Sequence, residues 1–462
     1  MAETRIRTAP ELNATGRVRR GYVAVGAFAV LATILSACTE PDVILPGKRE
    51  PITAVFSSSE AEEATQIVRP VNAAPDIRLP AQVANADAAQ NRGTQAFRTD
   101  NPRLSTSLTP VWSVGIGEGD SRRHRIVADP VVSGGRVFTL DALTLVSAIS
   151  TSGGVIWQRN VLPDGADEAD ATGGGLAVEG NVLYVASGFG AVSALDATTG
   201  ATLWTQDLET TGAGAPMIYG DLLYVIAGDM TGWAIDKRTG RMQWQITGAA
   251  SASNVLGAPT PVLAGDLVVF AFGSGEMQAV FRKGGLQRWG ATVVGERRGR
   301  ALANIGDVTG QPIEANGVIY AGNQSGRVVA VNAASGARIW SAKEGAIGRV
   351  VPVGGSVFFI SDRNELLRLN AQDGSRIWGV PLPNFVKDRP RRVAEVFANH
   401  GPILAGGRLI VASSDGVIRS FDPKSGALLG RTEIASGATT APVVAGQTLY
   451  IVSRDGRLVA YR

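Results

Sequence analysis

A unit of about 45 residues recurs through most of this chain, and it constrains the fold more than any other feature of the sequence. The unit consists of an apolar run that follows a glycine, a second apolar run that ends in Ala-x-Asp in the clearest copies, a turn that ends in glycine, and a strand with a tryptophan. The clearest copy has these last three at Asp196, Gly200 and Trp204. Four strands per unit at this spacing are typical of the blades of a β-propeller.

Each position of the unit has a physical reason. The aspartate at the end of a strand can accept hydrogen bonds from the N–H groups of the turn, and the glycine allows the positive φ angle that a hairpin needs. Burying a tryptophan between two sheets contributes on the order of 4–6 kcal/mol gross at about 25 cal/mol/Å². We therefore expect these tryptophans to join neighbouring sheets rather than to form a ligand cage. They are Trp112, Trp157, Trp204, Trp244, Trp289, Trp340 and Trp378.

The two ends of the repeat region predict how the ring closes. Gly430 takes the tryptophan position in one copy, which makes eight such positions in all. The final copy stops at Arg462 before its tryptophan strand, whereas an extra tryptophan strand precedes the first copy at 110–114. We expect these two parts to share one blade, because this pairing removes a free sheet edge. The sequence thus predicts an all-β fold, an eight-bladed β-propeller of four-stranded antiparallel blades over residues 106–462.

Residues 1–37 are typical of an export signal. Arginines precede an uncharged apolar run at 21–34, and small residues follow it, which is the pattern of a signal peptide. The tripeptide Leu-Ser-Ala directly before Cys38 resembles a bacterial lipobox. This resemblance implies that Cys38 is acylated, with palmitate among the acyl chains, and anchors a mature lipoprotein. An uncleaved anchor helix and an ordinary secretory signal are the alternatives.

The segment after the cysteine sets the expected location. Thr39 stands where an aspartate retains enteric lipoproteins at the inner membrane, so it favours the outer membrane. Residues 38–105 are rich in alanine, proline and asparagine and lack strand-like alternation. Such a segment cannot bury enough apolar surface to order itself, so we expect a flexible, disordered tether. This interpretation leaves room for part of it to lie along the folded domain.

The remaining composition excludes several function classes. Residues 38–462 carry 39 basic and 39 acidic side chains, whereas a nucleic-acid binder usually needs a basic face. One cysteine excludes an internal disulfide, and two histidines argue against a multi-histidine metal centre or a Ser-His-Asp triad. The glycines at 173–175 precede no Gly-Lys-Ser/Thr, so a phosphate loop is not expected. We predict no catalytic residues, no metal site and no cofactor.

The motif Ala-x-Asp-x-x-Thr-Gly-x-x-x-Trp resembles the tryptophan-docking motif of the PQQ-type quinoprotein propellers, and the resemblance covers residues 106–462. Two branches of this superfamily are relevant: quinoprotein dehydrogenases and BamB-type lipoproteins of the outer-membrane β-barrel assembly complex. The lipobox, the tether and the eight units resemble the BamB branch. The stretches 116–123 and 128–132 look like the start of the first blade in alphaproteobacterial BamB proteins.

This resemblance implies a function for the chain. It implies a non-catalytic scaffold on the periplasmic face of the outer membrane, which binds the POTRA domains of BamA and other BAM subunits and aids unfolded outer-membrane protein clients. A PQQ-dependent oxidoreductase is one alternative, although those enzymes use adjacent cysteines near the quinone and a calcium site, and here Cys38 stands alone. An envelope lipoprotein propeller with another protein partner is the second alternative.

The resemblance also implies where BamA contacts the chain, because loops of the middle blades make this contact in BamB proteins. Two loops match by position, at 253–259 and 302–309, and the second has Asp-Val-Thr where the family commonly has Asp-Val-Asp. The charged loop 296–300 lies beside them, with a merely solvated loop as the alternative. We interpret the charged loop 387–392 as plain surface. The implied partner-binding residues are Asn254, Val255, Leu256, Arg297, Arg298, Arg300, Asp307 and Thr309.

Overall fold

The computed structural model describes residues 72–90, 98–167, 173–250, 258–293, 295, 307–387 and 395–462. The expected signal peptide, Cys38 and the first part of the expected tether lie outside these residues. All regular structure within the described ranges is β-strand. Within these ranges there is no helix that is long and apolar enough to span a membrane.

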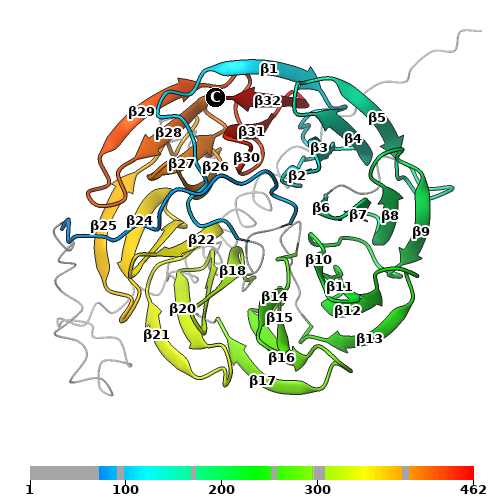
Figure 1. Cartoon of the computed structure of the whole chain (residues 1–462). Helices are drawn as coiled ribbons and strands as arrows, with labels where there is room; N and C mark the ends of the chain where they lie inside the picture. The colour runs from blue at the N-terminus through cyan, green and yellow to red at the C-terminus, as the bar shows by residue number, and fades with distance from the viewer. Residues whose placement is uncertain are drawn as a thin grey trace, which may run out of the picture. The chain divides into compact units, whose positions relative to one another are not determined.

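Eight blades of four antiparallel strands form a ring (Figure 1), as the sequence predicts. Blades 1 and 2 are β2 (Val131–Ser133), β3 (Arg136–Leu140), β4 (Leu145–Ser150), β5 (Val155–Asn160) and β6 (Gly174–Glu179), β7 (Val182–Ser187), β8 (Ala191–Asp196), β9 (Thr202–Asp207). Blades 3 and 4 are β10 (Met217–Tyr219), β11 (Leu222–Ile226), β12 (Thr231–Asp236), β13 (Met242–Thr247) and β14 (Val262–Ala264), β15 (Leu267–Ala271), β16 (Glu276–Phe281), β17 (Gln287–Thr292). Blades 5 and 6 are β18 (Gly310–Ala315), β19 (Val318–Asn323), β20 (Arg327–Asn332), β21 (Arg338–Ala342) and β22 (Ile347–Val353), β23 (Ser356–Ile360), β24 (Glu365–Asn370), β25 (Arg376–Pro381). Blades 7 and 8 are β26 (Asn399–Ala405), β27 (Arg408–Ser413), β28 (Val417–Phe421), β29 (Leu428–Glu433) and β30 (Val443–Ala445), β31 (Thr448–Ser453), β32 (Arg457–Tyr461), β1 (Pro110–Gly115).

Blade 8 confirms the predicted closure, because it combines the two ends of the propeller. Strand β1 pairs antiparallel with β32, and Trp112 lies opposite Ala460. Beyond this pair, the N–H of Thr109 donates to the carbonyl oxygen of Arg462 at 2.7 Å, and the reverse bond is 3.0 Å long. The ring is therefore held shut by a main-chain ladder between segments that are far apart in sequence.

The burial of the strands follows from their place in a blade. Middle strands such as β7 are covered on both faces by neighbouring blades, and they read as continuous apolar runs. Outermost strands such as β9 expose most of their residues and half-bury the tryptophan. The core is accordingly a series of apolar layers, each between two adjacent blades.

All seven predicted tryptophans dock on the next blade. Trp204 illustrates the contact: its Nε1 donates to the carbonyl oxygen of Lys237 at 3.1 Å. A Cβ atom on Gly240 would lie 2.7 Å from its ring, so only glycine fits there. The same bond to a turn carbonyl is made by Trp112, Trp157, Trp244, Trp289, Trp340 and Trp378.

Asp196, Asp236 and Asp422 cap three of the turns that receive these rings, as predicted for the aspartate position. The carboxylate of Asp196 accepts the N–H groups of Thr198 and Thr199, both at 2.8 Å. The hydrogen bond from the Thr199 N–H is the main cause that lowers the pKa of Asp196 below its usual value.

The tryptophan position of blade 7 is occupied by Gly430 for a structural reason. A ring at this position of β29 would dock on the turn between the last two strands of blade 8. That turn does not exist, because blade 8 takes its outermost strand from the other end of the chain. Thr109 and Arg462, which bond each other through their main chains, lie beside β1 and β32 in place of a turn that joins two consecutive strands.

Residues 72–90 and 98–108, which we call the strap, differ from the sequence-based expectation of a tether that reaches residue 105. They lie along one face of the propeller and cross the middle of the ring, in blue in Figure 1. The N–H of Ala73 donates to Ile377 on blade 6, and Asn85 bonds Val444 and Gly446 on blade 8. The strap is thus fixed to the blades by its backbone and polar groups, which composition alone does not reveal.

Candidate partner-binding face

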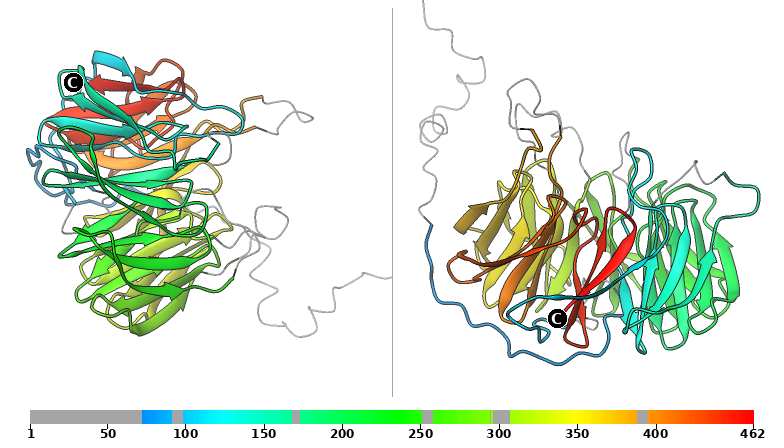
Figure 2. Two further views of the ribbon diagram at one scale, coloured as in Figure 1. Left: turned by 90° about the vertical axis from the view of Figure 1, so that its right-hand side faces the viewer. Right: turned by 90° about the horizontal axis from the view of Figure 1, so that it is seen from above.

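The propeller has two different faces, which Figure 2 shows from the side. The strap covers the face with the hairpins between the first and second strands of the blades, such as those at Gly134 and Gly446. The segments that connect successive blades lie on the opposite face, which we call the loop face. Both loops that the sequence predicts as partner-binding are connections of this kind, one before β14 and one before β18.

The structure describes two of the eight implied partner-binding residues. Asn254, Val255, Leu256, Arg297, Arg298 and Arg300 lie outside the described residues. Asp307 and Thr309 lie together on the wall of a partly open cavity of about 780 Å³ on the axis of the ring. Ala258 and Pro259, which end the other predicted loop, line the same cavity. The two loops therefore rejoin the propeller at one shared site.

Asp307 and its neighbours anchor the end of their loop. Asp307 is only 4% exposed, and Val308 packs in the apolar layer between blades 4 and 5. The hydroxyl of Thr309 donates to the carbonyl oxygen of Ala346 at 2.9 Å, and the N–H of Gly348 donates to the carbonyl oxygen of Thr309 at 3.2 Å. These contacts fix the base of the loop to blade 6.

Blades 4, 5 and 6 are joined more closely than the repeat pattern predicts. Strands β18 and β22 pair in parallel, with Gln311 opposite Arg349, so blades 5 and 6 form one eight-stranded sheet. The side-chain amide of Gln311 also bonds both main-chain groups of Thr260, at 3.2 Å and 3.0 Å. The middle blades thus give the predicted loops a rigid base.

An ion pair crosses the cavity. Asp129, just before β2 of blade 1, contacts the guanidinium of Arg349 on β22 of blade 6. The other carboxylate oxygen of Asp129 accepts the N–H of Ala441 at 2.8 Å. Sequence analysis missed Arg349 and Gln311, because neither belongs to a motif and their partners lie far away in the chain.

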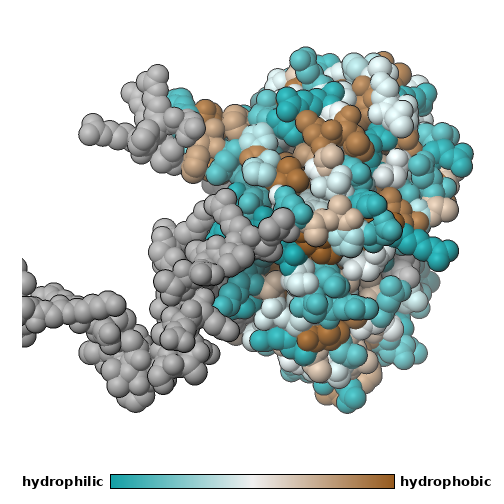
Figure 3. All heavy atoms as spheres, turned by 90° about the vertical axis from the view of Figure 1, so that its left-hand side faces the viewer, coloured by the Kyte–Doolittle hydropathy of each residue, from teal (hydrophilic) through white to brown (hydrophobic). Residues whose placement is uncertain are grey.

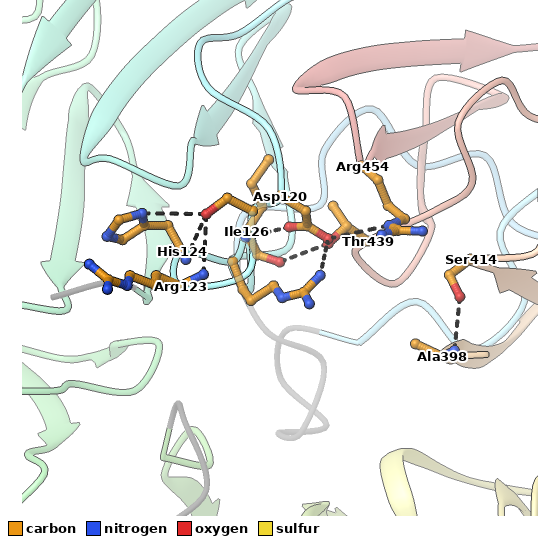
Figure 4. Close-up of polar contacts among 10 residues, drawn as sticks. Asp120, Arg123, His124, Ile126, Ala398, Ser414, Thr439 and Arg454 are labelled. Carbon is orange, nitrogen blue, oxygen red and sulfur yellow. Dashed lines mark hydrogen bonds and ion pairs between the residues drawn. The ribbon is translucent and has the colours of Figure 1, made fainter. Parts of the chain in front are cut away.

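The segment before β2 forms a second polar cluster on the loop face (Figure 4). Asp120 accepts the N–H of Ile126 and the hydroxyl of Thr439, both at 2.9 Å, and its carboxylate lies 3.8 Å from Nε of Arg454. The hydroxyl of Ser121 accepts the N–H of His124 at 3.0 Å. These bonds tie the start of blade 1 to blade 8.

His400, on β26, belongs to the same region of the molecule. Desolvation lowers its pKa below the usual value, while the negative charges of Asp129 and Asp120 oppose that shift. The imidazole is therefore favoured in its neutral form.

The outer rim of the ring carries single exposed apolar side chains. They precede the tryptophan positions and include Val111, Ile156, Leu203, Ile339 and Leu429. Figure 3 shows one side of the rim, where apolar groups stand as separate spots among polar ones. Separate spots of this kind are normal on a protein surface and do not mark an interface by themselves.

The described residues contain no group of three or more His, Cys, Asp or Glu side chains that could hold a metal ion. At the cavity, Asp129 and Arg349 are instead engaged with each other, and Asp129 also with the main chain of Ala441. The arrangement suits recognition of another molecule by shape and hydrogen bonding.

Comparison with known proteins points to one family. A family model described as outer membrane protein assembly factor BamB matches residues 142–380 and 388–462. Outer membrane protein assembly factor BamB of Yersinia pestis is 23% identical over 370 residues, which cover 78% of this chain and 91% of the relative. The protein of the same name from Escherichia coli (strain K12) is 25% identical over 366 residues, 77% of this chain and 89% of the relative.

Solved structures show the same fold. BamB from Moraxella catarrhalis superposes with a TM-score of 0.64 at 20% identity, over 77% of this chain and 100% of that chain. Quinohemoprotein alcohol dehydrogenase from Comamonas testosteroni gives a TM-score of 0.59 at 14% identity, over 81% of this chain and 80% of that chain. At these identities the likeness concerns the fold alone, which hosts both functions.

Proposed function

Because this chain belongs to the family of the outer membrane protein assembly factor BamB, we propose that it is a non-catalytic scaffold lipoprotein of the β-barrel assembly machinery. It binds the POTRA domains of BamA through the loop face and aids the folding and insertion of outer-membrane proteins. The observation that carries this proposal is the family match over most of the propeller, together with relatives that are named assembly factors.

The geometry of the loop face supports the proposed contact. Two loops from adjacent blades return to one cavity wall, and their bases are fixed by Thr309, Gln311 and the joined sheet of blades 5 and 6. A rigid base reduces the entropy lost when a loop is ordered against a partner. We propose that the buried Asp307 acts by positioning its loop, and that Asn254, Val255, Leu256, Arg297, Arg298 and Arg300 make the contact with BamA.

The anchor completes the proposal. Cys38 carries the acyl chains, and two or more chains give stable membrane attachment because each buried CH₂ contributes roughly 0.8 kcal/mol. A Cys38→Ala variant should no longer incorporate labelled palmitate, whereas incorporation equal to that of the parent chain would contradict acylation of Cys38.

Affinity purification of the full chain from detergent-solubilised membranes tests the partner. We expect BamA to co-purify with the chain. We expect less BamA to co-purify with an Asp307→Asn variant, because the negative charge that we propose to position the loop is then removed. Asp266→Asn is the matched control, because Asp266 has a side chain that is 89% exposed on the strap face of the adjacent blade 4. Reproducible absence of BamA would overturn the proposed function, and equal capture by Asp307→Asn would remove Asp307 from the site.

A further inference from the structure

The inner strands of a propeller blade have one edge that pairs with the next strand and one edge that faces the axis of the ring. Main-chain groups on the axial edge need partners, since an unpaired buried N–H is costly. Three consecutive strap residues supply such partners on three consecutive blades. Ala88 pairs with Val132 on β2, the carbonyl oxygen of Ala89 accepts the N–H of Val178 on β6 at 2.8 Å, and the amide of Gln90 bonds Ile218 on β10.

Proline removes the next axial donor in most blades. In blade 1, Pro130 lies two residues before Val132. When the blades are aligned on the hairpin between their first two strands, this position is a proline in six of the eight blades: Pro130, Pro216, Pro261, Pro312, Pro402 and Pro442. Proline has no N–H and is tolerated where the strand edge is not paired. The blades thus avoid an unpaired donor on the axis.

Two blades keep the donor at this position, and their surroundings differ. In blade 6 it is Val350, on the strand that β18 joins in parallel. In blade 2 it is Leu176, which alternates with Val178 along β6 in an unbroken ladder with β7. The N–H and C=O of Leu176 therefore point toward the axis, as those of Val178 do. Among the described residues, no hydrogen bond to these two groups is found.

Leu176 lies on the wall of the axial cavity, which has the shape that an extended chain needs. Gly174, Gly175 and Ala215 flank it, so main chain and small side chains form this part of the wall. The strap residues Ala88 and Gln90 close the end of the cavity. A segment that enters from the loop face therefore meets the edge of β6 directly above the point where Ala89 already pairs with it.

We propose that the axial cavity binds an extended polypeptide segment of another protein, which adds to the inner edge of β6 at Leu176. The strap is recognised in the same way on the same strand, because the main-chain carbonyl oxygen of Ala89 accepts a hydrogen bond from the N–H of Val178. Small side chains suit this segment at Leu176, because Gly174, Gly175 and Ala215 form the neighbouring part of the wall. This site goes beyond the proposed BamA contact, which belongs to the loops.

Binding of a short fluorescein-labelled peptide of alternating valine and serine to the purified full chain tests the proposal by fluorescence anisotropy. Leu176→Pro gives blade 2 the residue that six other blades have, and it removes the axial N–H without breaking the ladder with β7. Leu176→Ala is the matched control, because it removes more of the side chain and keeps the N–H. We expect Leu176→Pro to weaken binding by about tenfold or more, the effect of one lost hydrogen bond, and Leu176→Ala to change it by less than about threefold.

A peptide that is N-methylated at every residue provides a second measurement, which does not depend on the folding of a variant. It keeps the side chains but cannot pair along a strand edge, so we expect it not to bind. Saturable binding of the parent peptide with these losses supports the site. Equal binding by the N-methylated peptide, equal binding by a folded Leu176→Pro variant, equal loss in Leu176→Ala, or no saturable binding at all would overturn it.

Discussion

Removal of the Trp378 ring should show that inter-blade docking holds the propeller together. Trp378 is 0% exposed, its ring centroid lies 5.8 Å from that of Phe358, and its Nε1 donates to Lys424 O at 2.9 Å. Truncation of a buried tryptophan to alanine costs about 3–5 kcal/mol. Trp378→Phe keeps most of the packing, and the carbonyl oxygen of Lys424 still accepts a hydrogen bond from Nη1 of Arg368 at 2.9 Å. We therefore expect this variant to lose only about 1–2 kcal/mol of unfolding free energy.

These free energies convert into shifts of the melting temperature. About 390 residues form the compact unit, and about 2.1 cal/mol/K per residue gives an unfolding entropy near 0.8 kcal/mol/K. Trp378→Ala should therefore lower Tm by about 4–6 °C and Trp378→Phe by about 1–2 °C, measured by calorimetry under conditions where unfolding is reversible. Equal shifts for the two variants, or a shift below about 1 °C for alanine, would refute the docking argument.

Three further outcomes are expected. Gly430→Trp should leave the unfolding free energy within about 0.5 kcal/mol, because the turn that would receive the ring is absent; a rise in Tm above about 3 °C would contradict this explanation. Gln90→Ala should speed hydrogen exchange at the amide of Ile218, whereas Gln82→Ala, on an exposed strap residue, should not; equal rates in both variants would show that the amide contact is unimportant. Since the pKa of His400 is lowered in the folded state, the unfolded state binds more protons, so stability should fall as pH drops below about 6.5. His400→Gln should flatten this part of a Tm-against-pH curve, and an unchanged slope would exclude His400 as its cause.

The fold was predictable because its signal is local and repeated. Most blades carry the turn glycine and the tryptophan, and three carry the aspartate, so a departure in one copy, such as Gly430, does not obscure the count of repeats. The closure at Trp112 was predictable for a different reason. The last copy lacks one strand and the first is preceded by one, and only a shared blade satisfies both edges.

The strap and the cavity were not predictable in the same way. Residues 72–90 read as a tether because they are small and polar, yet their main-chain groups pair with strand edges that exist only after the ring has formed. The contact of Asp129 with Arg349 joins residues from opposite parts of the repeat region, and no spacing rule connects them. The prolines around the axis are visible in the sequence, but the register of each blade is needed to show which N–H group they remove.

The shared blade makes the order of synthesis matter. Strand β1 emerges before every other strand of the ring, and its partner β32 follows all of them. Until residues 457–461 arrive, β1 and β31 each lack a neighbour, however well the intervening blades have formed. A chain that lacks residues 457–461 thus keeps every other strand of the ring but presents two unpaired strand edges, and such edges are prone to pair with other chains.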